Sequence, residues 1–290
     1  MSHLYNFYKE SIKDTKYVLL HESSFEQLLS KTKHLVHETD GKIDGLLLYG
    51  TTDAIYINLT LGPIEILRTL INELIDISTL PIKIHFNQVV KLQWYVDHTH
   101  IHPNYQGVIY NSPLHKLYQE LGFIETSIQD TYLCNLETFV MPKEITNNLE
   151  TLAKEGYEVT YYDKLIHRGM DNFLTKLSAK SFSDAIITNE LKPIPDPLLI
   201  VSHNKEVSGF AGPLSVSHDN RGVFYGIEIT GDVQGKGLGK ALFNILCFKL
   251  KSKGAKYMTL FTGRENKAKY IYMSAGFKKV ESFALMVYKK

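Results

Sequence analysis

The sequence predicts a mixed α/β fold (an α+β mixed sheet) in which one type of domain occurs twice in tandem. The chain has 290 residues, enough for two domains that each bury a core. Strand and helix patterns alternate along its second half, and a short motif occurs once near the end of each half. Hydrophobic residues make up 44% and charged residues 22% of the chain, which excludes a disordered, collagen-like or disulfide-scaffold protein.

The repeated motif is YQELGF at residues 118–123, which returns as YMSAGF at residues 272–277. A glycine followed by an aromatic residue is also an ordinary way to end a helix, so the similarity alone does not require a common origin. However, each copy precedes a strand-like tail at the same place in its half, which favours duplication. We therefore expect domains at residues 1–145 and 146–290, joined by the polar segment that begins at Pro142.

The elements of the second half follow from the spacing of apolar residues. In order, the pattern predicts a strand at 157–162, a helix at 165–180, strands at 198–202, 207–212 and 223–229, a helix at 240–253, a strand at 256–262 and a helix at 265–275. The three central strands suit an antiparallel meander. The strand–helix–strand step after them requires parallel pairing of its two strands.

In the first half, the equivalent strand is predicted at residues 54–61. It passes through Gly62 and Pro63 directly into a helix that starts at Ile64. Proline suits the first helical position, but it removes a backbone donor. We therefore expect no anion site at this turn.

The net charge of +1 conceals two opposite halves. Residues 1–145 contain 11 Lys and Arg against 17 Asp and Glu, and residues 146–290 contain 21 against 14, which gives net charges of −6 and +7. A basic half favours an anionic ligand, either nucleic acid or a phosphorylated cofactor. No arginine-rich tail or aromatic RNA-binding signature is present, so the cofactor is the favoured interpretation.

The segment with the most specific chemistry joins the strand at 223–229 to the following helix. Gly235, Gly237 and Gly239 bring backbone N–H groups to the first turn of that helix, where unpaired donors and the helix dipole suit a phosphate. The residues between and after them, Lys236 and Lys240, add charge that could reach the same anion, or are ordinary solvated lysines.

Spacing excludes two well-known phosphate loops. A Rossmann fingerprint requires a sixth-position Gly or Ala, but counting from Gly235 that position is Lys240. A Walker A loop requires four residues between its glycines and then Lys-Ser/Thr, whereas three residues separate Gly235 from Gly239, and Ala241 replaces the hydroxyl residue.

What remains is the pattern Gln/Arg-x-x-Gly-x-Gly/Ala, which residues Gln234 to Gly239 satisfy. It resembles the coenzyme A loop of the GNAT acetyltransferase superfamily. About 30 residues later, the segment NKAKYIYMSAGF at 266–277 is similar to the family's second signature, Asn-x-x-Ala followed by Tyr-x-x-x-Gly-Phe, except that Ala268 stands two positions after Asn266 and not three. The resemblance covers residues 155–290 and implies two GNAT-like acyl-CoA N-acyltransferase domains in tandem. It departs from the family at Gly231, where proline is frequent, which we expect to loosen the strand bulge without changing the chemistry.

The resemblance implies that acetyl-CoA, as the acyl donor, lies where strand 223–229 splays from its neighbour. The implied cofactor-binding residues are Ile227, Ile229, Gln234, Gly235, Lys236, Gly237, Leu238, Gly239, Lys240 and Asn266. Backbone groups of Ile227 and Ile229 would pair with pantetheine amides, and the Ile229 N–H would lie near the thioester carbonyl. Asn266 would hold pantetheine or the acceptor, unless it is a simple helix cap.

Two residues are the catalytic candidates. Tyr272 is expected to act as general acid, since a phenol with a reference pKa of about 10 stays protonated at neutral pH; its alternative role is a packed helix aromatic. Glu228 could act as base or bind the acceptor's ammonium group, but which face of its strand looks into the cleft cannot be read from the sequence. Asp219 and Glu265 are its rivals, and a water relay would need none of them.

The expected function is therefore acetyl-CoA-dependent N-acetylation of a primary amine, by direct attack of the amine on the thioester. The alternative is a non-catalytic acyl-CoA-binding or regulatory module. The expected partner is a small-molecule or peptide amine, with no nucleic acid, no membrane and no metal, and the location is expected to be cytoplasmic. The acidic first copy is interpreted as a degenerate GNAT-like domain that does not bind coenzyme A and that could shape the acceptor pocket.

Histidine and cysteine are the remaining residue types that could bind a metal or react. His98, His100 and His102 alternate, so a strand would point them to one side as a zinc site requires, but Pro103 interrupts the run. Polar packing or acceptor contacts are favoured over metal binding for these histidines. Cys134 and Cys247, both in apolar contexts, are expected to be buried thiols.

Overall fold

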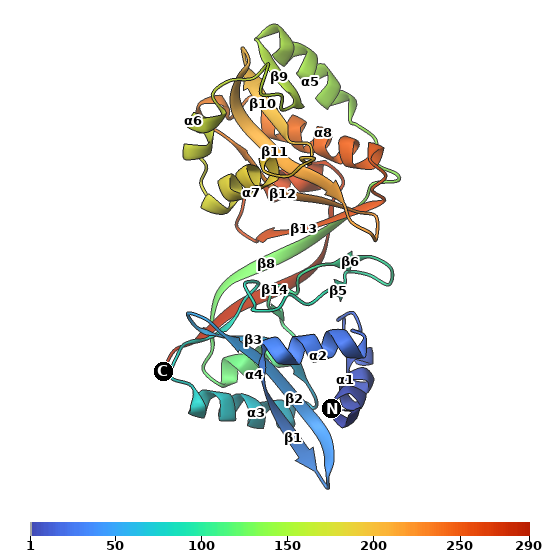
Figure 1. Ribbon diagram of the computed structural model, residues 1–290, viewed down its shortest axis with the longest axis vertical. Helices are drawn as coiled ribbons and strands as arrows, with labels where there is room; N and C mark the ends of the chain where they lie inside the picture. The colour runs from blue at the N-terminus through green and yellow to red at the C-terminus, as the bar shows by residue number, and fades with distance from the viewer. Residues whose placement is uncertain (1) are drawn as a thin grey trace. The chain divides into compact units, whose positions relative to one another are not determined.

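The computed structural model describes residues 2–290 and has a mixed α/β fold (Figure 1). Its residues form two compact units, which interleave along the chain. Unit 1 consists of residues up to Thr131, Leu260–Asn266 and Lys279–Lys290, and unit 2 of Tyr132–Thr259 and Lys267–Lys278. Neither unit coincides with the predicted ranges 1–145 and 146–290. None of the helices in this described part is both long and apolar enough to span a bilayer.

Unit 1 is built around three antiparallel strands followed by a fourth strand that pairs in parallel with the third. Its elements are α1 (Ser2–Ser11), η1 (Ile12–Asp14), α2 (Glu22–Lys31), β1 (Lys33–Thr39), β2 (Lys42–Thr51), β3 (Ile55–Leu61), α3 (Ile64–Ile77), β4 (Ile82–Ile84), β5 (Trp94–Tyr95), β6 (Ile101–His102), β7 (Val108–Ile109), α4 (Pro113–Glu120) and most of β8 (Ile124–Asn135). Pairing runs β1–β2–β3 antiparallel, and β3–β4 is parallel. The predicted strand at 54–61 and the helix from Ile64 are thus present, although Pro63 is the N-cap rather than the first helical residue.

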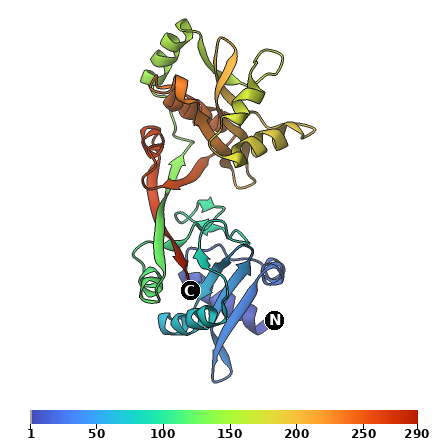
Figure 2. The same cartoon turned by 90° about the vertical axis from the view of Figure 1, so that its left-hand side faces the viewer.

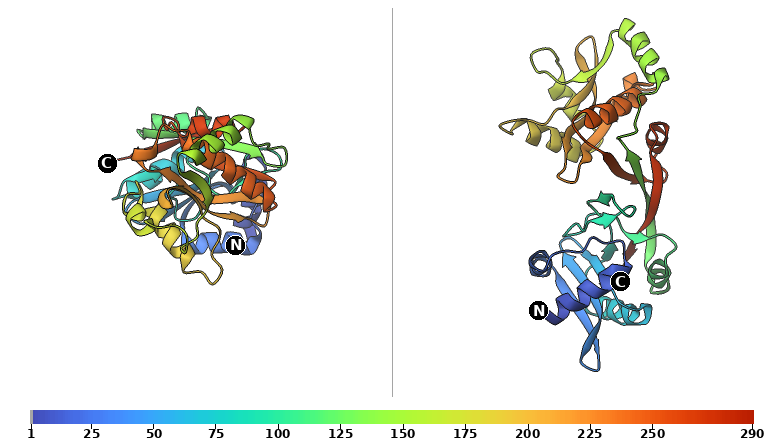
Figure 3. Two further views of the ribbon diagram at one scale, coloured as in Figure 1. Left: turned by 90° about the horizontal axis from the view of Figure 1, so that it is seen from above. Right: turned by 90° about the vertical axis from the view of Figure 1, so that its right-hand side faces the viewer.

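The sheet of unit 1 separates two apolar layers. Leu47 and Tyr49 of β2 belong to a core that contains α3, whereas their neighbours Leu46 and Leu48 belong to a core that contains α1 and α2. This is the alternation that a strand imposes on successive side chains. Figures 2 and 3 show the result, with the sheet of this unit between α3 on one side and α1 and α2 on the other.

Unit 2 contains the meander that the sequence predicts. Its elements are α5 (Lys143–Lys154), β9 (Tyr157–Tyr161), α6 (Met170–Thr175), α7 (Lys180–Glu190), β10 (Leu199–His203), β11 (Glu206–Val216), β12 (Arg221–Ile229), η2 (Gly231–Val233), α8 (Leu238–Ser252), the first residues of β13 (Tyr257–Gly263) and α9 (Lys269–Ser274). The order β9–β10–β11–β12 is antiparallel, and β12–β13 is parallel as predicted. One core lies under α6 and α7, and the buried face of α8 packs on the opposite side of the strands.

The predicted helix at 165–180 is wrong. The structure has a loop up to Gly169, then the short helix α6, and a separate helix α7 that begins where the predicted one should end. Gly169 takes a φ of 78°, which stops a continuous helix. The loop before it is held by His167, whose Nδ1 accepts the Asp163 backbone N–H at 3.0 Å, a local side-chain bond that the spacing of apolar residues does not show.

The two copies of the repeated motif have the same local geometry. In each, the backbone N–H of the phenylalanine donates to the backbone carbonyl of the tyrosine, Phe123 to Tyr118 at 2.9 Å and Phe277 to Tyr272 at 3.1 Å. The glycines before them have φ values of 87° and 88°, the left-handed C-terminal conformation that ends a helix. Each motif is followed by a long strand, β8 or β14 (Lys278–Tyr288), and β14 pairs with β4 and β7 of unit 1.

Candidate active site

The glycine turn between β12 and α8 presents free backbone donors. Gly235 and Gly237 have φ values of 85° and 81°, where other residues are strained, and Gly237 is the N-cap of α8. The first hydrogen bond inside the helix runs from the Ala241 N–H to the Gly237 carbonyl at 3.0 Å. The backbone N–H groups between Gly237 and Ala241 therefore have no partner within the helix. Together with the helix dipole they form a site for an anion.

A cavity of about 400 Å³ opens beside this turn. It is lined by every predicted site residue except Lys236 and Asn266. Sequence reasoning did not assign Val233, Ala268 and Ile271, which also line it. The last two stand four and one positions before Tyr272 on α9 and its entry, and helical spacing from that tyrosine could have found Ala268.

The backbone of β12 is open toward this cavity. Thr230 donates its N–H to the Ser208 carbonyl of β11 at 2.9 Å. Since successive strand residues direct their N–H groups to opposite edges, the Ile229 N–H faces away from β11. On that side β12 pairs with β13 only at Arg221 and Gly222, so the two parallel strands part before Ile229 and leave its donor available to a ligand.

Gln234 holds the end of β12 through its side chain. Its Nε2 donates to the Ile229 carbonyl at 2.9 Å. The side chain therefore fixes the strand end relative to the turn, while the turn's own amides stay directed at the cavity. This is a positioning role.

Tyr272 lies against the cavity with its ring packed on Phe243, the ring centroids 4.8 Å apart. Burial, and to a lesser extent the nearby Tyr132, raises the pKa of the Tyr272 phenol to about 12. The phenol is therefore fully protonated at neutral pH. Tyr272 is therefore a packed helix aromatic at the wall of the cavity, and its role as general acid stays a prediction.

Glu228 also lines the cavity, but its carboxylate already has partners. It accepts the Ser178 backbone N–H at 3.0 Å and the Ser178 hydroxyl at 2.7 Å. These bonds hold the loop that precedes α7. Its rival Asp219 stands before β12, at the other end of that strand from Ile229, and receives the Tyr257 hydroxyl at 2.6 Å; Glu265 belongs to unit 1.

The two lysines of the turn form ion pairs with α5 and its end. Lys236 lies 3.2 Å from Glu155 and 5.4 Å from the centroid of the Tyr157 ring. Lys240 lies 2.6 Å from Glu144. All four charged groups are substantially exposed, so each pair is of the kind that contributes at most about 1 kcal/mol and rearranges readily for an incoming anion.

The remaining candidates lie in unit 1. Asn266 donates to the Thr262 hydroxyl at 2.9 Å, and its part in binding stays a prediction. Of the three histidines, His100 pairs with Asp97 at 2.8 Å, His102 is buried against Trp94, and His98 is exposed. Among residues 2–290 no group of three or more His, Cys, Asp or Glu side chains is arranged to hold a metal ion.

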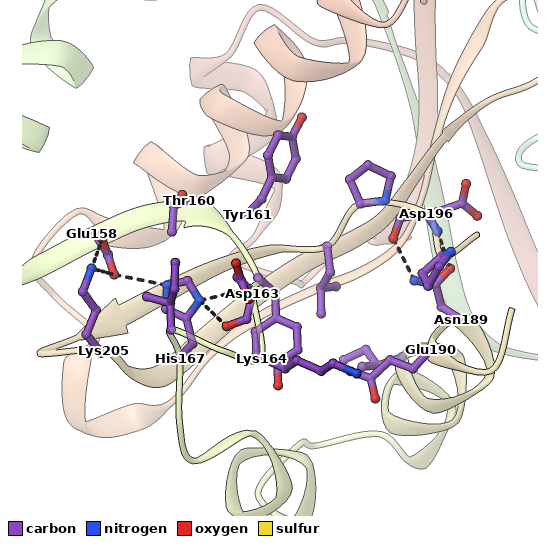
Figure 4. A pocket seen from close by; sticks show the side chains of 16 residues that line it. Glu158, Thr160, Tyr161, Asp163, Lys164, His167, Asn189, Glu190, Asp196 and Lys205 are labelled. Atoms are coloured by element: carbon purple, nitrogen blue, oxygen red, sulfur yellow. Dashed lines mark hydrogen bonds and ion pairs between the residues drawn. The ribbon is translucent and has the colours of Figure 1, made fainter. Parts of the chain in front are cut away.

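A larger cavity of about 830 Å³ lies at the β9 edge of unit 2 (Figure 4). Its buried polar groups are engaged with each other. His167 is 3.2 Å from Glu158, which in turn is 2.9 Å from Lys205, and the Asn189 amide exchanges two hydrogen bonds with the Asp196 backbone. These contacts tie together the strand, the loop and α7, which is a structural use of the polar side chains.

Comparisons with known proteins agree with this geometry. Residues 163–277 match the model of the Acetyltransferase (GNAT) family. Among the curated proteins no sequence matches the chain.

Solved structures show the same fold at low identity. The GCN5-related glucosamine N-acetyltransferase region of a fungal multi-domain GH3 β-N-acetylglucosaminidase has a TM-score of 0.68 and 14% identity over 99% of this chain, which spans 36% of that protein. An acetyltransferase of the GNAT family from Colwellia psychrerythraea has a TM-score of 0.55 and 13% identity, covering 100% of this chain and 97% of that one. A tandem GNAT protein from the clavulanic acid biosynthesis pathway has a TM-score of 0.53 and 8% identity, over 99% and 94%. The two-domain GNAT architecture is thus present.

Proposed function

Since residues 163–277 belong to the GNAT family of acetyltransferases, we propose that this protein transfers an acetyl group from acetyl-CoA to a primary amine by direct attack on the thioester. The family supports acyl transfer in general. The donor, the amine acceptor and the direct attack are the parts that we propose here.

The observation that carries the proposal is the pairing of an anion site with an open strand edge. The amides at the start of α8 suit the pyrophosphate of a coenzyme A thioester, and the neighbouring Ile229 N–H is free of β11. A donor in that position stabilises the oxyanion that develops on an attacked carbonyl, an effect worth on the order of 10²–10³-fold in rate. Holding the amine in line with the carbonyl carbon adds a further gain from proximity.

The proton balance assigns a role to Tyr272. When the amine nitrogen bonds to the carbonyl carbon, the carbon–sulfur bond breaks and the leaving thiolate needs a proton. The Tyr272 phenol, which burial keeps protonated, supplies it, and the phenolate that remains takes a proton back from solvent before the next turnover. The proton lost from the amine goes to water or to Glu228; since Glu228 is held by Ser178, we favour water and give Glu228 the orientation of the α7 loop.

The test compares two tyrosines of one helix. Purified protein is mixed with acetyl-CoA and a panel of primary amines, and release of free coenzyme A is followed. Tyr272→Phe should lower the turnover rate at least 100-fold, within the range of general acid catalysis, while coenzyme A affinity measured by calorimetry stays within about twofold. Tyr270→Phe is the matched control, because Tyr270 is 64% exposed and should leave both quantities unchanged.

The same experiment separates the enzyme from a non-catalytic acyl-CoA module. A module of that kind would bind coenzyme A and release none from acetyl-CoA with any amine, and its binding would be indifferent to Tyr272→Phe. Absence of coenzyme A binding altogether would refute both readings.

A further inference from the structure

Helix α5 lies beside the glycine turn that begins α8. It contacts β9 and α8 (Figure 1), and its two buried residues, Ile145 and Leu152, anchor it in unit 2. α5 precedes residues 163–277, which match the family model, so the match says nothing of its role. Its contacts with the turn are the evidence for that role.

Three residues of one side of α5 reach the turn. Asn148 and the C-cap residue Glu155 follow Glu144 by close to one and three helical turns, which places all three on the same side of the helix. The Asn148 Nδ2 donates to the Lys236 carbonyl at 3.4 Å, and a Cβ built on Gly237 would meet that nitrogen at 2.9 Å. The polar side of α5 therefore lies directly against the backbone of the turn.

The two carboxylates of this side hold the two ammonium groups of the turn. Glu155 lies 3.2 Å from Lys236, and Glu144 lies 2.6 Å from Lys240. The Lys236 ammonium also lies 5.4 Å from the centroid of the Tyr157 ring on β9, and Lys236 does not line the cavity beside the turn. Its charge is thus directed to α5 and β9 and away from the anion site.

This pairing removes most of the attraction that the lysines would give to an anion. Two lysines and two glutamates have no net charge, so the backbone amides are the remaining attraction while both pairs are intact. An anion gains a lysine only when a carboxylate releases it, and the released carboxylate then repels the anion at short range. Because both pairs are exposed and individually weak, this exchange is accessible.

We propose that Glu144 and Glu155 of α5 compete with the phosphates of the cofactor for Lys240 and Lys236, and thereby set the affinity of the anion site. This rests on the proposed function, because the anion is taken to be the diphosphate of coenzyme A. The amides of the turn make the specific contact with the diphosphate. α5 determines how much charge the two lysines add to it.

The test measures the affinity of the full-length protein for coenzyme A by calorimetry. Glu144→Gln and Glu155→Gln should each raise it about two- to fivefold, the range that one exposed ion pair can supply, and the double variant should show about the product of the two gains. Glu150→Gln is the matched control. Glu150 is an exposed residue of the same helix, and its spacing from Glu144 directs it to another side, so this variant should bind coenzyme A like the parent protein.

The salt dependence of binding provides a readout that a merely structural role would not change. In the double variant the two lysines are unpaired, so they attract the phosphates and the attraction is screened by salt. Its affinity for coenzyme A should therefore fall more steeply with ionic strength than that of the parent protein. Since exposed pairs contribute little to folding, each variant should melt within about 4 °C of the parent.

Equal or weaker coenzyme A binding by Glu144→Gln and Glu155→Gln would overturn this role of α5 and leave the proposed function standing. A gain of the same size in Glu150→Gln would do so too, because the effect would then be one of overall charge. If neither the parent nor any variant bound coenzyme A, the proposed function would fail and the role of α5 with it.

Discussion

Replacing Gly235 by alanine tests the anion site at the start of α8. Gly235 has a φ of 85°, and a Cβ built on it meets no atom of the protein within 4 Å. The substitution therefore introduces backbone strain and no internal clash. Placing alanine in the left-handed region costs about 1 to 2 kcal/mol of unfolding free energy. Because Gly235 lines the cavity, we expect the added methyl group to crowd a phosphate bound at the turn's backbone amides.

The effect on ligand affinity follows from the bond that is lost. A hydrogen bond to a charged group contributes about 1.5 to 3 kcal/mol. At 1.4 kcal/mol per factor of ten, Gly235→Ala should weaken coenzyme A binding about 10- to 100-fold. Calorimetric titration gives the affinity, and thermal unfolding gives the stability.

Gly254 provides a matched control for the strain. It has a φ of 94°, also meets nothing within 4 Å, and follows the far end of the same helix. Gly254→Ala should lower the stability by a similar amount and leave the affinity unchanged. If the two variants bind coenzyme A equally well, the turn does not hold the pyrophosphate and the site assignment is wrong.

Three further predictions concern titratable groups. Burial would raise the pKa of Asp130, but hydrogen bonds lower it overall, foremost the one from the Arg264 guanidinium 3.0 Å away. The stability that this pair contributes is present above the unfolded-state pKa and is lost as pH falls through the folded-state pKa. Asp130→Asn should therefore make the melting temperature fall less steeply with pH below about pH 4. Because the pKa of Tyr272 is about 12, the turnover rate should show no alkaline decline from this phenol up to about pH 10, and a decline centred near pH 8 would contradict the role of Tyr272 as proton donor. Burial raises the pKa of Cys134 to about 11 and holds that of Cys247 well above its ordinary value, so a thiol reagent should modify neither cysteine in the native protein, and fast labelling without unfolding would disagree with the structure.

The glycine turn and its surroundings could be predicted from the sequence, because their structure depends on residues that are close together in the chain. Glycines at fixed spacing between an apolar strand and an amphipathic helix leave few alternatives, and the structure places Gly235 and Gly237 in the backbone region that the turn requires. The same holds for the helix ends at Gly122 and Gly276. Pocket residues on either side of the turn follow from it by strand and helix periodicity.

Other features depend on contacts that are distant in sequence. The sequence does not show whether Glu228 acts as a base or holds a loop. Its hydrogen bond with Ser178 is the observation that favours the second role. α7 was missed although Phe182 and Ile186 have helical spacing, because Ala179 at its N-cap gives no capping signal in the sequence.

The interleaving of the two units was not predictable from periodicity. The alternation in residues 278–288 is the same whichever sheet that strand joins, and a repeat in tandem suggests that each copy keeps its own last strand. Instead β14 pairs with β4 through Met286 and Ile84. Strand partners are chosen by tertiary packing, which the pattern of one strand does not encode.

This arrangement sets the order in which the protein is completed during synthesis. All of unit 2 lies before Lys279, whereas unit 1 needs residues 279–290 to leave the ribosome. The half that is translated first is therefore finished last, and until then the edge of β4 that β14 will cover is exposed to other strands.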